Sequence, residues 1–370
     1  MNLDFSEDQK QLKDQARRLL TDRCPPAAVR RVLDGEAKYD RALWKTVADM
    51  GYLGTAVPEE YGGLGIGYLE LCVIAEELGR TLAPIPFSSS VYLAAEFLRS
   101  AGSVEQKRNY LPKLATGETI GTFAFAERAG AVTPASISAT VVQDRLSGTK
   151  LPVADGGIAN FAVVAARGPA GVGLYLVDLK GPGVTRESVV TIDPTRDHAR
   201  IVFDGAPAEP LGEPGDAWRI IEDVQNRAAV LVAFEQIGGA DRAIEMARDY
   251  ALERFAFGRQ IGSFQAIKHM LSDMYVSATL ARSNAYWAAW ALSTDAGELP
   301  EAAASARVSA TLAFQQCAKN NIQVHGGMGF TWQFDCHLYY RRSNLLALSL
   351  GGLSTWEDRL IEQLRRKNAA

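Results

Sequence analysis

Apolar side chains recur every three or four positions in two long parts of the chain, near its start and from residue 228 onward. In the first part this spacing predicts helices over residues 7–20, 40–50, 68–80, 91–100 and 104–116. Ser6 precedes the first of them, and acidic residues occupy its first turn, as a helix dipole favours. The start of the chain is therefore expected to be helical.

The pattern changes between residues 120 and 212, where short β-rich runs are separated by glycine, proline and aspartate. Examples are TFAFA, FAVVAAR, GLYLVDL and ARIVFDG. Runs of this length and composition are typical of strands. The series predicts a small antiparallel barrel or sandwich.

From residue 228 the apolar positions have the spacing of packed helices. One stripe is Ile237, Ala240, Ile244, Ala247 and Ala251; a second is Ile267, Leu271, Met274, Ala278, Ala281 and Ala285. Alternating steps of four and three predict antiparallel bundle packing. Gly238, Gly239 and Ala240 would let a neighbouring helix approach closely. Further helices are expected over 300–324, 335–346 and 354–366.

A chain of 370 residues is too long for one ordinary core. We therefore expect an α+β protein with three domains. These are an N-terminal helical domain (1–118), a central β domain (119–213) and a C-terminal helical bundle domain (214–370).

Composition narrows the function classes. With 39 basic and 43 acidic residues the net charge is −4, which gives no reason to expect nucleic acid or membrane binding. The four cysteines form no CxxC and are interpreted as reduced, buried thiols in a cytoplasmic protein. The histidines show no metal-ligand spacing, and no GxSxG supports hydrolase chemistry. The acidic, polar start does not resemble a signal peptide, and no apolar run reaches membrane-spanning length.

The segment ERFAFGRQIGSFQAIKHM (253–270) carries the strongest chemical signal. It places Arg254, Arg259, Gly258 and Gly262 between two predicted helices. Guanidinium groups beside a turn and a helix start can hold a phosphate. The alternative is an ordinary interhelical turn with solvated arginines. QVHGGMGF (323–330) has a similar alternative, a helix end capped by glycine. VPEEYGGLGIG (57–67) lacks a phosphate-loop ending and is interpreted as a structural loop.

Together these motifs resemble the flavin-dependent acyl-CoA dehydrogenases over nearly the whole chain. The resemblance implies that family's α+β fold, with an N-terminal helical domain, a central antiparallel β-barrel and a C-terminal four-helix bundle. The resemblance implies a tetramer in which FAD lies at a subunit interface and is contacted by the neighbour's helical bundle. It also implies an acyl-CoA substrate and an electron acceptor protein. The positions that match the cofactor contacts are Arg254, Ala256, Phe257, Ile261, Phe264, Gln323, Gly326 and Gly327. Ala256 departs from the family, which often has a hydroxyl residue there.

The family reaction needs a carboxylate to take a proton from the carbon next to the thioester. The resemblance places this Glu at one of two positions, which here are Leu350 and Ala228. A register shifted by two gives Asn226, which cannot act as a base either. The nearest acids, Glu222, Glu235 and Glu357, lie too far along the chain to replace it. No catalytic base is therefore predicted in this chain.

The resemblance also implies side chains that meet the flavin ring from the β domain. At the two hydroxyl positions this chain has Ala126 and Ala154, and at the indole position it has Pro152. Hydrocarbon side chains cannot supply those hydrogen bonds, and proline also lacks the backbone N–H.

The chain keeps the residues that match the cofactor contacts but lacks the flavin-ring residues and the Glu. In this it resembles the glutamate-less subunit of acyl-CoA dehydrogenases that are heterotetramers of two unlike subunits. Such enzymes act on bulky substrates, among them CoA-linked steroid side chains. We expect this chain to complete the FAD site of a homologous Glu-bearing subunit. The alternatives are a self-sufficient homotetramer, with a non-standard base or another flavin reaction, and a non-catalytic scaffold.

Overall fold

The computed structural model describes residues 5–369, so residues 1–4 and 370 of the expected terminal domains lie outside the described residues. The chain packs as two compact units. The helical unit comprises Met1–Val29, Tyr68–Ala83 and Ala229–Ala370, and the sheet unit comprises Arg30–Gly67 and Pro84–Ala228. Because each unit draws on separate stretches of the chain, packing does not follow chain order. The domain boundaries at residues 118 and 213 remain a prediction.

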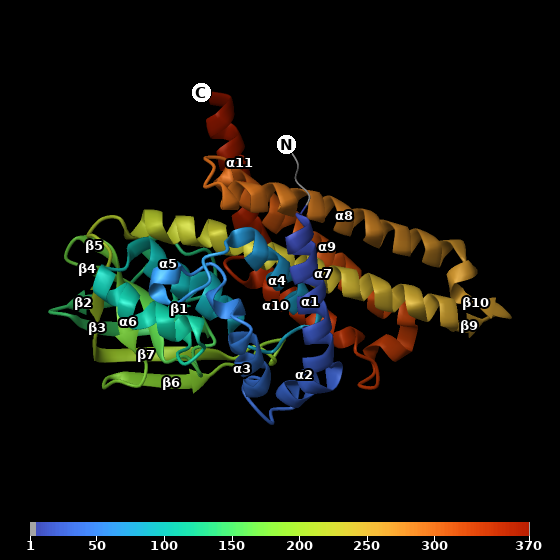
Figure 1. Ribbon diagram of the computed structural model, residues 1–370, viewed down its shortest axis with the longest axis horizontal. Coiled ribbons are helices and arrows are strands. Elements are labelled where there is room, and N and C mark those ends of the chain that lie inside the picture. The colour runs from blue at the N-terminus through green and yellow to red at the C-terminus, as the bar shows by residue number, and fades with distance from the viewer. Residues whose placement is uncertain (1–4, 370) are drawn as a thin grey trace. The chain divides into compact units, whose positions relative to one another are not determined.

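Long helices make up most of the helical unit (Figure 1). They are α1 (Glu7–Arg23), α4 (Tyr68–Arg80), α7 (Ala217–Glu253, from Ala229 on), α8 (Gln265–Ser293), α9 (Leu299–His325), α10 (Cys336–Leu348) and α11 (Leu353–Ala369). The α7–α8 connection contains β9 (Phe255–Ala256), β10 (Arg259–Gln260) and the 3-10 turn η5 (Ile261–Ser263). A second 3-10 turn, η6 (Gly326–Phe330), follows α9. The expected helical C-terminal domain is confirmed.

Glycine allows α4 and α7 to meet backbone to backbone, and allows a ring of α9 to pack directly on α7. A Cβ at Gly79 of α4 would stand 1.9 Å from the carbonyl oxygen of Glu235, and one at Gly238 of α7 would stand 1.8 Å from that of Glu76. On the next residue, a Cβ at Gly239 would stand 2.4 Å from the ring of Phe314 in α9. Only glycine fits such crossings. The predicted close approach at Gly238 and Gly239 is confirmed.

The predicted apolar stripes are buried over most of their length. In α7 the buried row passes through Ala243, whereas Ile244 is only half-buried. In α8, Ile267 and Leu271 are half-buried, and the fully buried row begins at Met274. The spacing predicted that the whole stripe of α8 is buried. In the single chain, the first part of that stripe stays half-buried.

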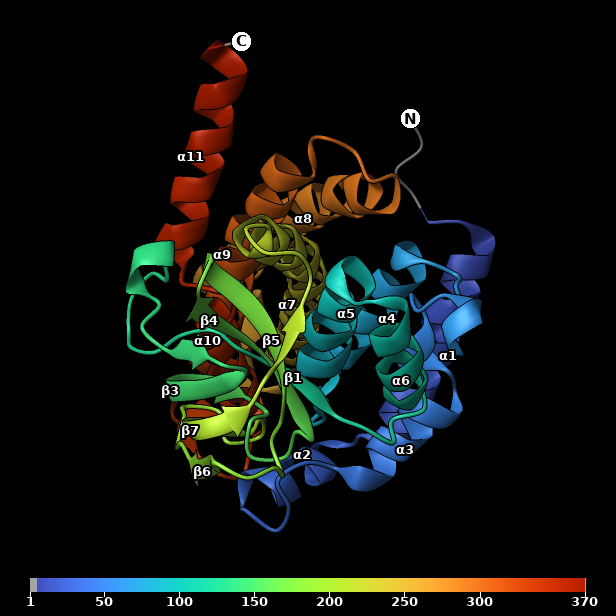
Figure 2. The same ribbon diagram turned by 90° about the vertical axis from the view of Figure 1, so that its left-hand side faces the viewer.

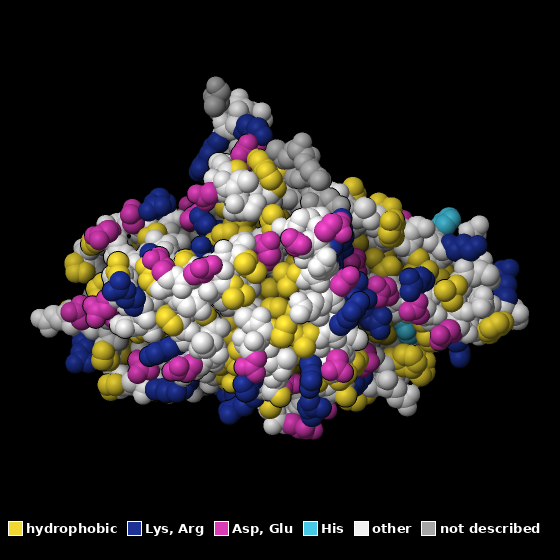
Figure 3. Space-filling view, in the orientation of Figure 1, with side chains coloured by type: hydrophobic (Ala, Val, Ile, Leu, Met, Phe, Trp, Pro, Cys, Tyr) yellow, Lys and Arg dark blue, Asp and Glu magenta, His cyan; other side chains and the backbone are white. Residues whose placement is uncertain are grey.

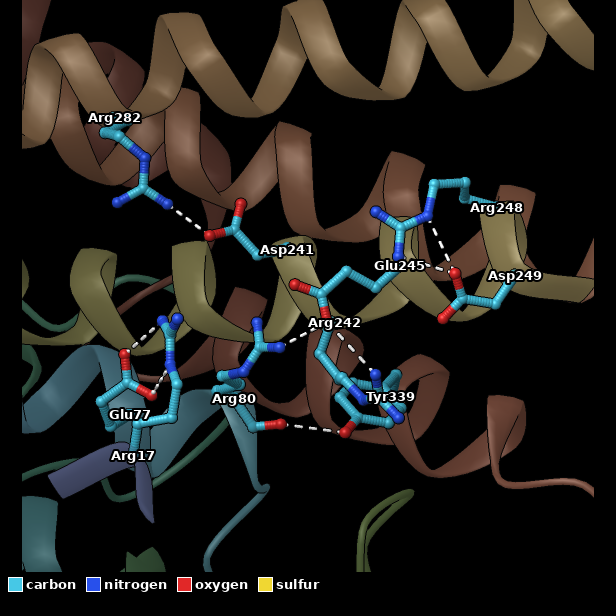
Figure 4. A network of polar contacts seen from close by, with 10 residues as sticks. All are labelled: Arg17, Glu77, Arg80, Asp241, Arg242, Glu245, Arg248, Asp249, Arg282 and Tyr339. Carbon is cyan, nitrogen blue, oxygen red and sulfur yellow. Dashed lines mark hydrogen bonds and ion pairs between the residues drawn. The ribbon is translucent and has the colours of Figure 1, made fainter. Parts of the chain in front are cut away.

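Ion pairs and one hydrogen bond connect five helices of this unit (Figure 4). Between α1 and α4, Arg17 binds Glu77 at 2.7 Å. The remaining contacts are Arg282 with Asp241 (α8–α7), Arg80 with Glu245 (α4–α7), and the Tyr339 hydroxyl donating to the Arg80 carbonyl at 2.9 Å (α10–α4). Partly buried networks of this kind fix helix register more than they add to stability.

The sheet unit surrounds an open, mixed sheet. Its strands are β1 (Gly121–Ala124), β2 (Thr140–Val142), β3 (Arg145–Ala154), β4 (Phe161–Gly168), β5 (Gly171–Asp178), β6 (Val184–Ser188), β7 (His198–Pro207) and β8 (Glu209–Leu211). Its helices and turns are α3 (Arg41–Asp49), η1 (Tyr52–Gly54), η2 (Glu59–Tyr61), η3 (Ser88–Ala94), α5 (Ala95–Ala101), α6 (Val104–Ala115) and η4 (Pro134–Ser136); α2 (Pro26–Leu33) begins in the helical unit and ends here.

The expectation of an antiparallel barrel or sandwich is wrong in its topology. Hydrogen-bonded strands follow the order β6-β7-β3-β2-β4-β5-β8, with β1 paired to β4, so the path of described strands has two ends. The β1–β4 pair is parallel, as is the contact of Thr140 with Arg167 between β2 and β4. Parallel neighbours need long connections, which alternation along a strand does not reveal.

Helices cover one side of this sheet, as Figure 2 shows for α5 and α6. The core between them is apolar and includes Phe97 and Leu98 from α5, Leu111 from α6, and Phe123 and Val163 from the sheet. All are at least nine-tenths buried. Burial of such side chains supplies most of the stability of a unit of this size.

Within residues 5–369, no helix combines the length and the apolarity that crossing a bilayer requires. The four cysteines are buried and unpaired with one another. Burial raises the pKa of the Cys317 and Cys336 thiols to about 12. They act as small apolar core residues.

Candidate functional site

A short hairpin closes the connection between α7 and α8. Arg254 follows the last residue of α7; its N–H donates to the carbonyl of Tyr250, and its own carbonyl accepts from the N–H of Ile261, both at 2.8 Å. Ala256 pairs with Arg259 across β9 and β10. Gly258 turns the hairpin with φ +79°. Two backbone hydrogen bonds thus fix the position of the Arg254 backbone at the end of α7.

Aromatic rings and cations are exposed on this hairpin. Phe257 is 95% exposed and meets the ring of Phe264 edge-on, with centroids 6.2 Å apart. The guanidinium of Arg259 lies 4.2 Å from the centre of the same ring, a cation–π contact. Arg254 is exposed and forms no ion pair within residues 5–369, while Ala256 and Ile261 are half-buried. The hairpin therefore presents one cation fixed on a ring and one unneutralised cation.

The second candidate segment is the glycine turn at the end of α9. The Gly326 N–H donates to the carbonyl of Gln323, and Gly326 adopts φ +60°, which glycine tolerates best. Gln323, Gly326 and Gly327 are exposed. A Cβ at Gly326 or Gly327 would meet nothing within 4 Å. Backbone at both glycines is therefore open to a ligand.

Ring stacking brings the two segments together within the helical unit. The Tyr250 and His325 rings stack at 4.1 Å and 23°, and Phe334 meets both nearly edge-on, at 5.9 and 5.6 Å. Tyr250 stands four residues before Arg254, and His325 directly precedes Gly326. All eight sequence-predicted contact residues therefore lie in two adjoining segments.

The surface at this end of α7 and α8 mixes charge with apolar area. In Figure 3, basic and hydrophobic side chains lie side by side at the end where Figure 1 places β9 and β10. Exposed residues of this region include Arg254, Arg259, Lys268, Phe255 and Phe257. Cations with flat apolar faces suit a ligand that carries both phosphate and an aromatic base.

No carboxylate occupies the expected base positions. Ala228 is fully buried, and Asn226 is half-buried. Among the nearest acids, Glu222 is exposed and accepts from the Trp218 indole at 2.8 Å, Glu235 is buried, and Glu357 is exposed.

Leu350 sits in a turn that is bonded by the chain itself. It adopts φ +61°, and its carbonyl accepts from the Trp356 indole at 3.2 Å. The buried Arg307 of α9 donates to the carbonyls of Leu346 and Ser349, the latter at 2.8 Å. Burial lowers the pKa of Arg307 to about 9, against the charge of Glu235.

Arg307 is itself held from two sides. It donates to the Gln236 side chain of α7 at 2.6 Å and to the Thr311 hydroxyl at 2.7 Å. Both terminal nitrogens of Arg307 are therefore hydrogen-bonded within the protein, whereas its buried Nε has no partner among the described residues. We call residues 346–352 together with Arg307 the α10–α11 turn.

In the sheet unit, the three expected ring-side positions offer no side-chain donor. The Ala126 carbonyl accepts from the Leu151 N–H at 2.8 Å, and the Ala154 carbonyl accepts from the Thr122 hydroxyl at 2.6 Å. Pro152 is exposed. The carbonyl groups of Ala126 and Ala154 are therefore already hydrogen-bonded within the sheet unit.

A buried ion pair lies next to these positions. The Lys150 amine donates to Glu127 at 2.8 Å and to the Phe125 carbonyl at 3.0 Å. Burial raises the pKa of the Glu127 carboxyl, but hydrogen bonds from Lys150, Ser138 and Ala139 outweigh it and lower that pKa to about 2. Burial lowers the pKa of the Lys150 amine.

Several residues of this site carried no recognisable sequence signal. Tyr250 and Phe334 were not singled out, and Arg307 gave no motif. The one signal that could have found Tyr250 is an aromatic residue one helical turn before Arg254. His325 lies inside the glycine motif, and its ring stacks on Tyr250.

Two family models match the chain. Residues 6–118 match the model described as acyl-CoA dehydrogenase, N-terminal domain, and residues 215–354 match that described as acyl-CoA dehydrogenase, C-terminal domain. Together they cover more than half of the sequence.

Named proteins and solved structures agree with these models. The acyl-CoA dehydrogenase IpdE2 of Mycobacterium tuberculosis is 32% identical over 342 residues, which cover 91% of each chain. A variant of the Tcur3481-Tcur3483 steroid ACAD is 32% identical with a TM-score of 0.88, covering 98% of this chain and 99% of the other. The ChsE4-ChsE5 complex from Mycobacterium tuberculosis contains a chain 28% identical, with a TM-score of 0.90 and 99% coverage of both.

Proposed function

The chain belongs to the acyl-CoA dehydrogenase family, and from this premise we propose that it is a subunit that completes the cofactor site of a Glu-bearing partner. Acyl-CoA dehydrogenases are FAD-dependent. Bound FAD would supply the acceptor for the hydride that leaves the β carbon of the acyl thioester. A base on the partner chain would take the proton from the α carbon.

The observation that carries this proposal is a difference within one chain. The hairpin and the glycine turn offer what a dinucleotide needs, whereas residues 226, 228 and 350 offer no carboxylate. A chain that worked alone would need both.

The hairpin and the glycine turn fit the diphosphate of FAD. Arg254 is exposed and has no ion-pair partner within residues 5–369, so its guanidinium is available for an oxyanion. Gly326 and Gly327 have open space where a side chain would stand, so backbone can approach closely. We assign Arg254 to the diphosphate and Gln323 to the adenosine side. Ala256, Phe257, Ile261 and Phe264 would shape the same surface, with Gly326 and Gly327.

The ring end of the flavin would be held elsewhere. Ala126 and Ala154 present hydrocarbon side chains, and Pro152 presents no donor. The Lys150 amine, which lies nearby, is bonded to Glu127 and to a carbonyl. We therefore assign the isoalloxazine to the partner chain.

Assembly and substrate class are proposed from likeness. One similar structure is titled a steroid ACAD with two chain names, and another is titled a complex of two proteins. On that basis we propose a heterotetramer acting on CoA thioesters of bulky, steroid-derived acids. A separate redox protein would accept the electrons.

Co-expression with a homologous Glu-bearing chain tests the proposal. One FAD per pair of unlike chains is expected, with acyl-CoA oxidation by the pair and none by this chain alone. One FAD per chain, or a yellow and active homotetramer of this chain, would contradict it. A pair that binds no FAD would indicate a scaffold instead.

A further inference from the structure

Three rings form a bridge between the two segments of the candidate site. His325 of α9 stacks on Tyr250 of α7, and Phe334, just before α10, contacts both rings. His325 is 6% exposed, and its Nδ1 donates to the carbonyl of Asn321 at 2.8 Å. A buried ring fixed by a backbone bond has little freedom to turn. We call Tyr250, His325 and Phe334 the ring bridge.

A second set of contacts lies one helical turn back along the same helices. The Asn321 amide donates to the Met246 sulfur at 3.9 Å, and its oxygen accepts from the Cys336 thiol at 3.8 Å. Met246 precedes Tyr250 by four residues, as Asn321 precedes His325. The ring bridge is therefore the outer of two layers that join α7, α9 and the start of α10.

The ring bridge is directly connected to the hairpin through Tyr250 and to the glycine turn through His325. On one side, the Tyr250 carbonyl accepts the N–H of Arg254. On the other, His325 is the last residue of α9, and Gly326 follows it. Arg254, Gly326 and Gly327 are exposed, whereas Ala256 and Ile261 of the hairpin are half-buried. The ring stack links the two segments at the helix ends from which they leave.

We propose that the ring bridge, with His325 at its centre, positions Arg254 relative to the Gly326–Gly327 backbone so that both reach one diphosphate. This inference rests on the proposed function, because it assigns a role toward the FAD that this chain would help to hold. His325 acts through Arg254 and the glycines and is a positioning residue, not a contact to the cofactor.

The affinity of the assembled pair for FAD tests this role. His325→Leu keeps apolar volume but removes the stack and the donor, and should raise the Kd for FAD about tenfold. His325→Phe keeps a ring and should remain within about threefold of the unchanged pair. Titration of the FAD-stripped pair, followed by flavin fluorescence, measures both. Tyr250→Leu removes the same stack from α7 and replaces His325→Leu if that variant does not assemble.

His337 offers a matched control. It is 8% exposed and stacks on Trp332 at 4.8 Å and 16°, but both residues lie on the α10 side and neither belongs to α7. His337→Leu removes a comparable stack that includes none of the three ring-bridge residues. It should change the Kd for FAD less than about twofold.

Hydrogen exchange on the full chain alone gives a readout independent of flavin. In His325→Leu, the amide of Ile261, which closes the hairpin onto Arg254, should exchange at least about fivefold faster. In His325→Phe and His337→Leu, the same amide should exchange at the rate of the unchanged chain.

The two proposals fail differently. If Arg254→Ala leaves the Kd for FAD unchanged, the proposed function is wrong and this inference with it. If Arg254→Ala weakens FAD binding but His325→Leu weakens it no more than His337→Leu, only the inference is overturned. Exchange at Ile261 that is equal in His325→Leu and His337→Leu also overturns it.

Discussion

The α7–α8 hairpin and the α10–α11 turn treat their polar groups in opposite ways. In the hairpin, Arg254 is exposed and forms no ion pair within residues 5–369. In the α10–α11 turn, Arg307 bonds the carbonyls of Leu346 and Ser349, and Trp356 bonds that of Leu350. One region leaves charge available to a ligand, and the other uses its polar groups within the chain. We therefore look for ligand binding at the hairpin and for a contribution to stability at the α10–α11 turn.

The sheet unit extends this contrast. The Lys150 amine, close to the expected ring-side positions, is buried and bonded to Glu127 and a carbonyl. Like Arg307, it supports the chain's own structure. The four predictions below change one side of the contrast at a time.

Removing Arg307 should have the largest effect. Arg307→Met removes the charged donor from Gln236 Oε1 and from the carbonyls of Leu346 and Ser349, and leaves Gln236 Oε1, within residues 5–369, with only the 3.4 Å contact of the Thr311 hydroxyl. It should lower the free energy of unfolding by about 3–5 kcal/mol. Urea unfolding of the full chain measures it. As a control, Arg366→Met removes an exposed arginine paired with Glu362 and should cost less than about 0.5 kcal/mol. Equal losses in the two variants would show that the turn does not depend on Arg307.

Removing Arg254 should leave stability unchanged and weaken cofactor binding. Arg254→Ala in the assembled pair should raise the Kd for FAD roughly 30- to 150-fold, because a charged hydrogen bond contributes about 2–3 kcal/mol. Arg248→Ala is the control, since Arg248 lies six residues earlier and is paired with Asp249 at 2.6 Å. An equal response of the two variants would place the diphosphate elsewhere.

Glu127 should give the sheet unit a pH-dependent stability. Its pKa is about 2 in the folded chain and about 4.3 when unfolded. This stabilisation is therefore full above about pH 4.3 and is lost as the pH falls towards 2. Glu127→Gln should lower the free energy of unfolding at pH 6 by about 1–2 kcal/mol and by less at pH 3.

Urea unfolding at both pH values provides the measurement. Glu187→Gln, which removes an exposed carboxylate paired with Arg200 at 3.1 Å, should show no such difference. A cost for Glu127→Gln that does not shrink at pH 3 would mean that the carboxylate is not held ionised by Lys150.

Restoring a carboxylate at the base position should have the smallest effect. Leu350→Glu places a carboxylate in a turn whose backbone is already fixed, while Ala126, Pro152 and Ala154 still offer nothing to a flavin ring. The variant purified alone should show no acyl-CoA oxidation in a dye-reduction assay with added FAD. Turnover by that lone variant would mean that a complete ring site exists in this chain.

Much of the fold was predictable because helix periodicity and strand alternation reflect local burial. The stripe from Met274 to Ala285 and the close approach at Gly238 are examples. The direction of strand pairing was not predictable, because alternation in β1 and β4 does not say that they run parallel. Nor does helical spacing say that Ile267 and Leu271 stay half-buried in a single chain.

The candidate site divides in the same way. Arg254 and the glycines stood out because they lie in two motifs that are contiguous in sequence, 253–270 and 323–330. Tyr250 and Arg307 did not, because the groups they bind lie far along the sequence: His325 is 75 residues from Tyr250, and Gln236 is 71 from Arg307. Whether the eight contact residues bind FAD remains a prediction.

A structure of the assembled pair with FAD and an acyl-CoA substrate analogue is the most direct test. We expect the isoalloxazine on the partner chain, with Arg254 of this chain at the diphosphate and the partner's carboxylate facing the α carbon. An isoalloxazine seated on Ala126, Pro152 and Ala154, with a carboxylate of this chain facing that carbon, would contradict the account.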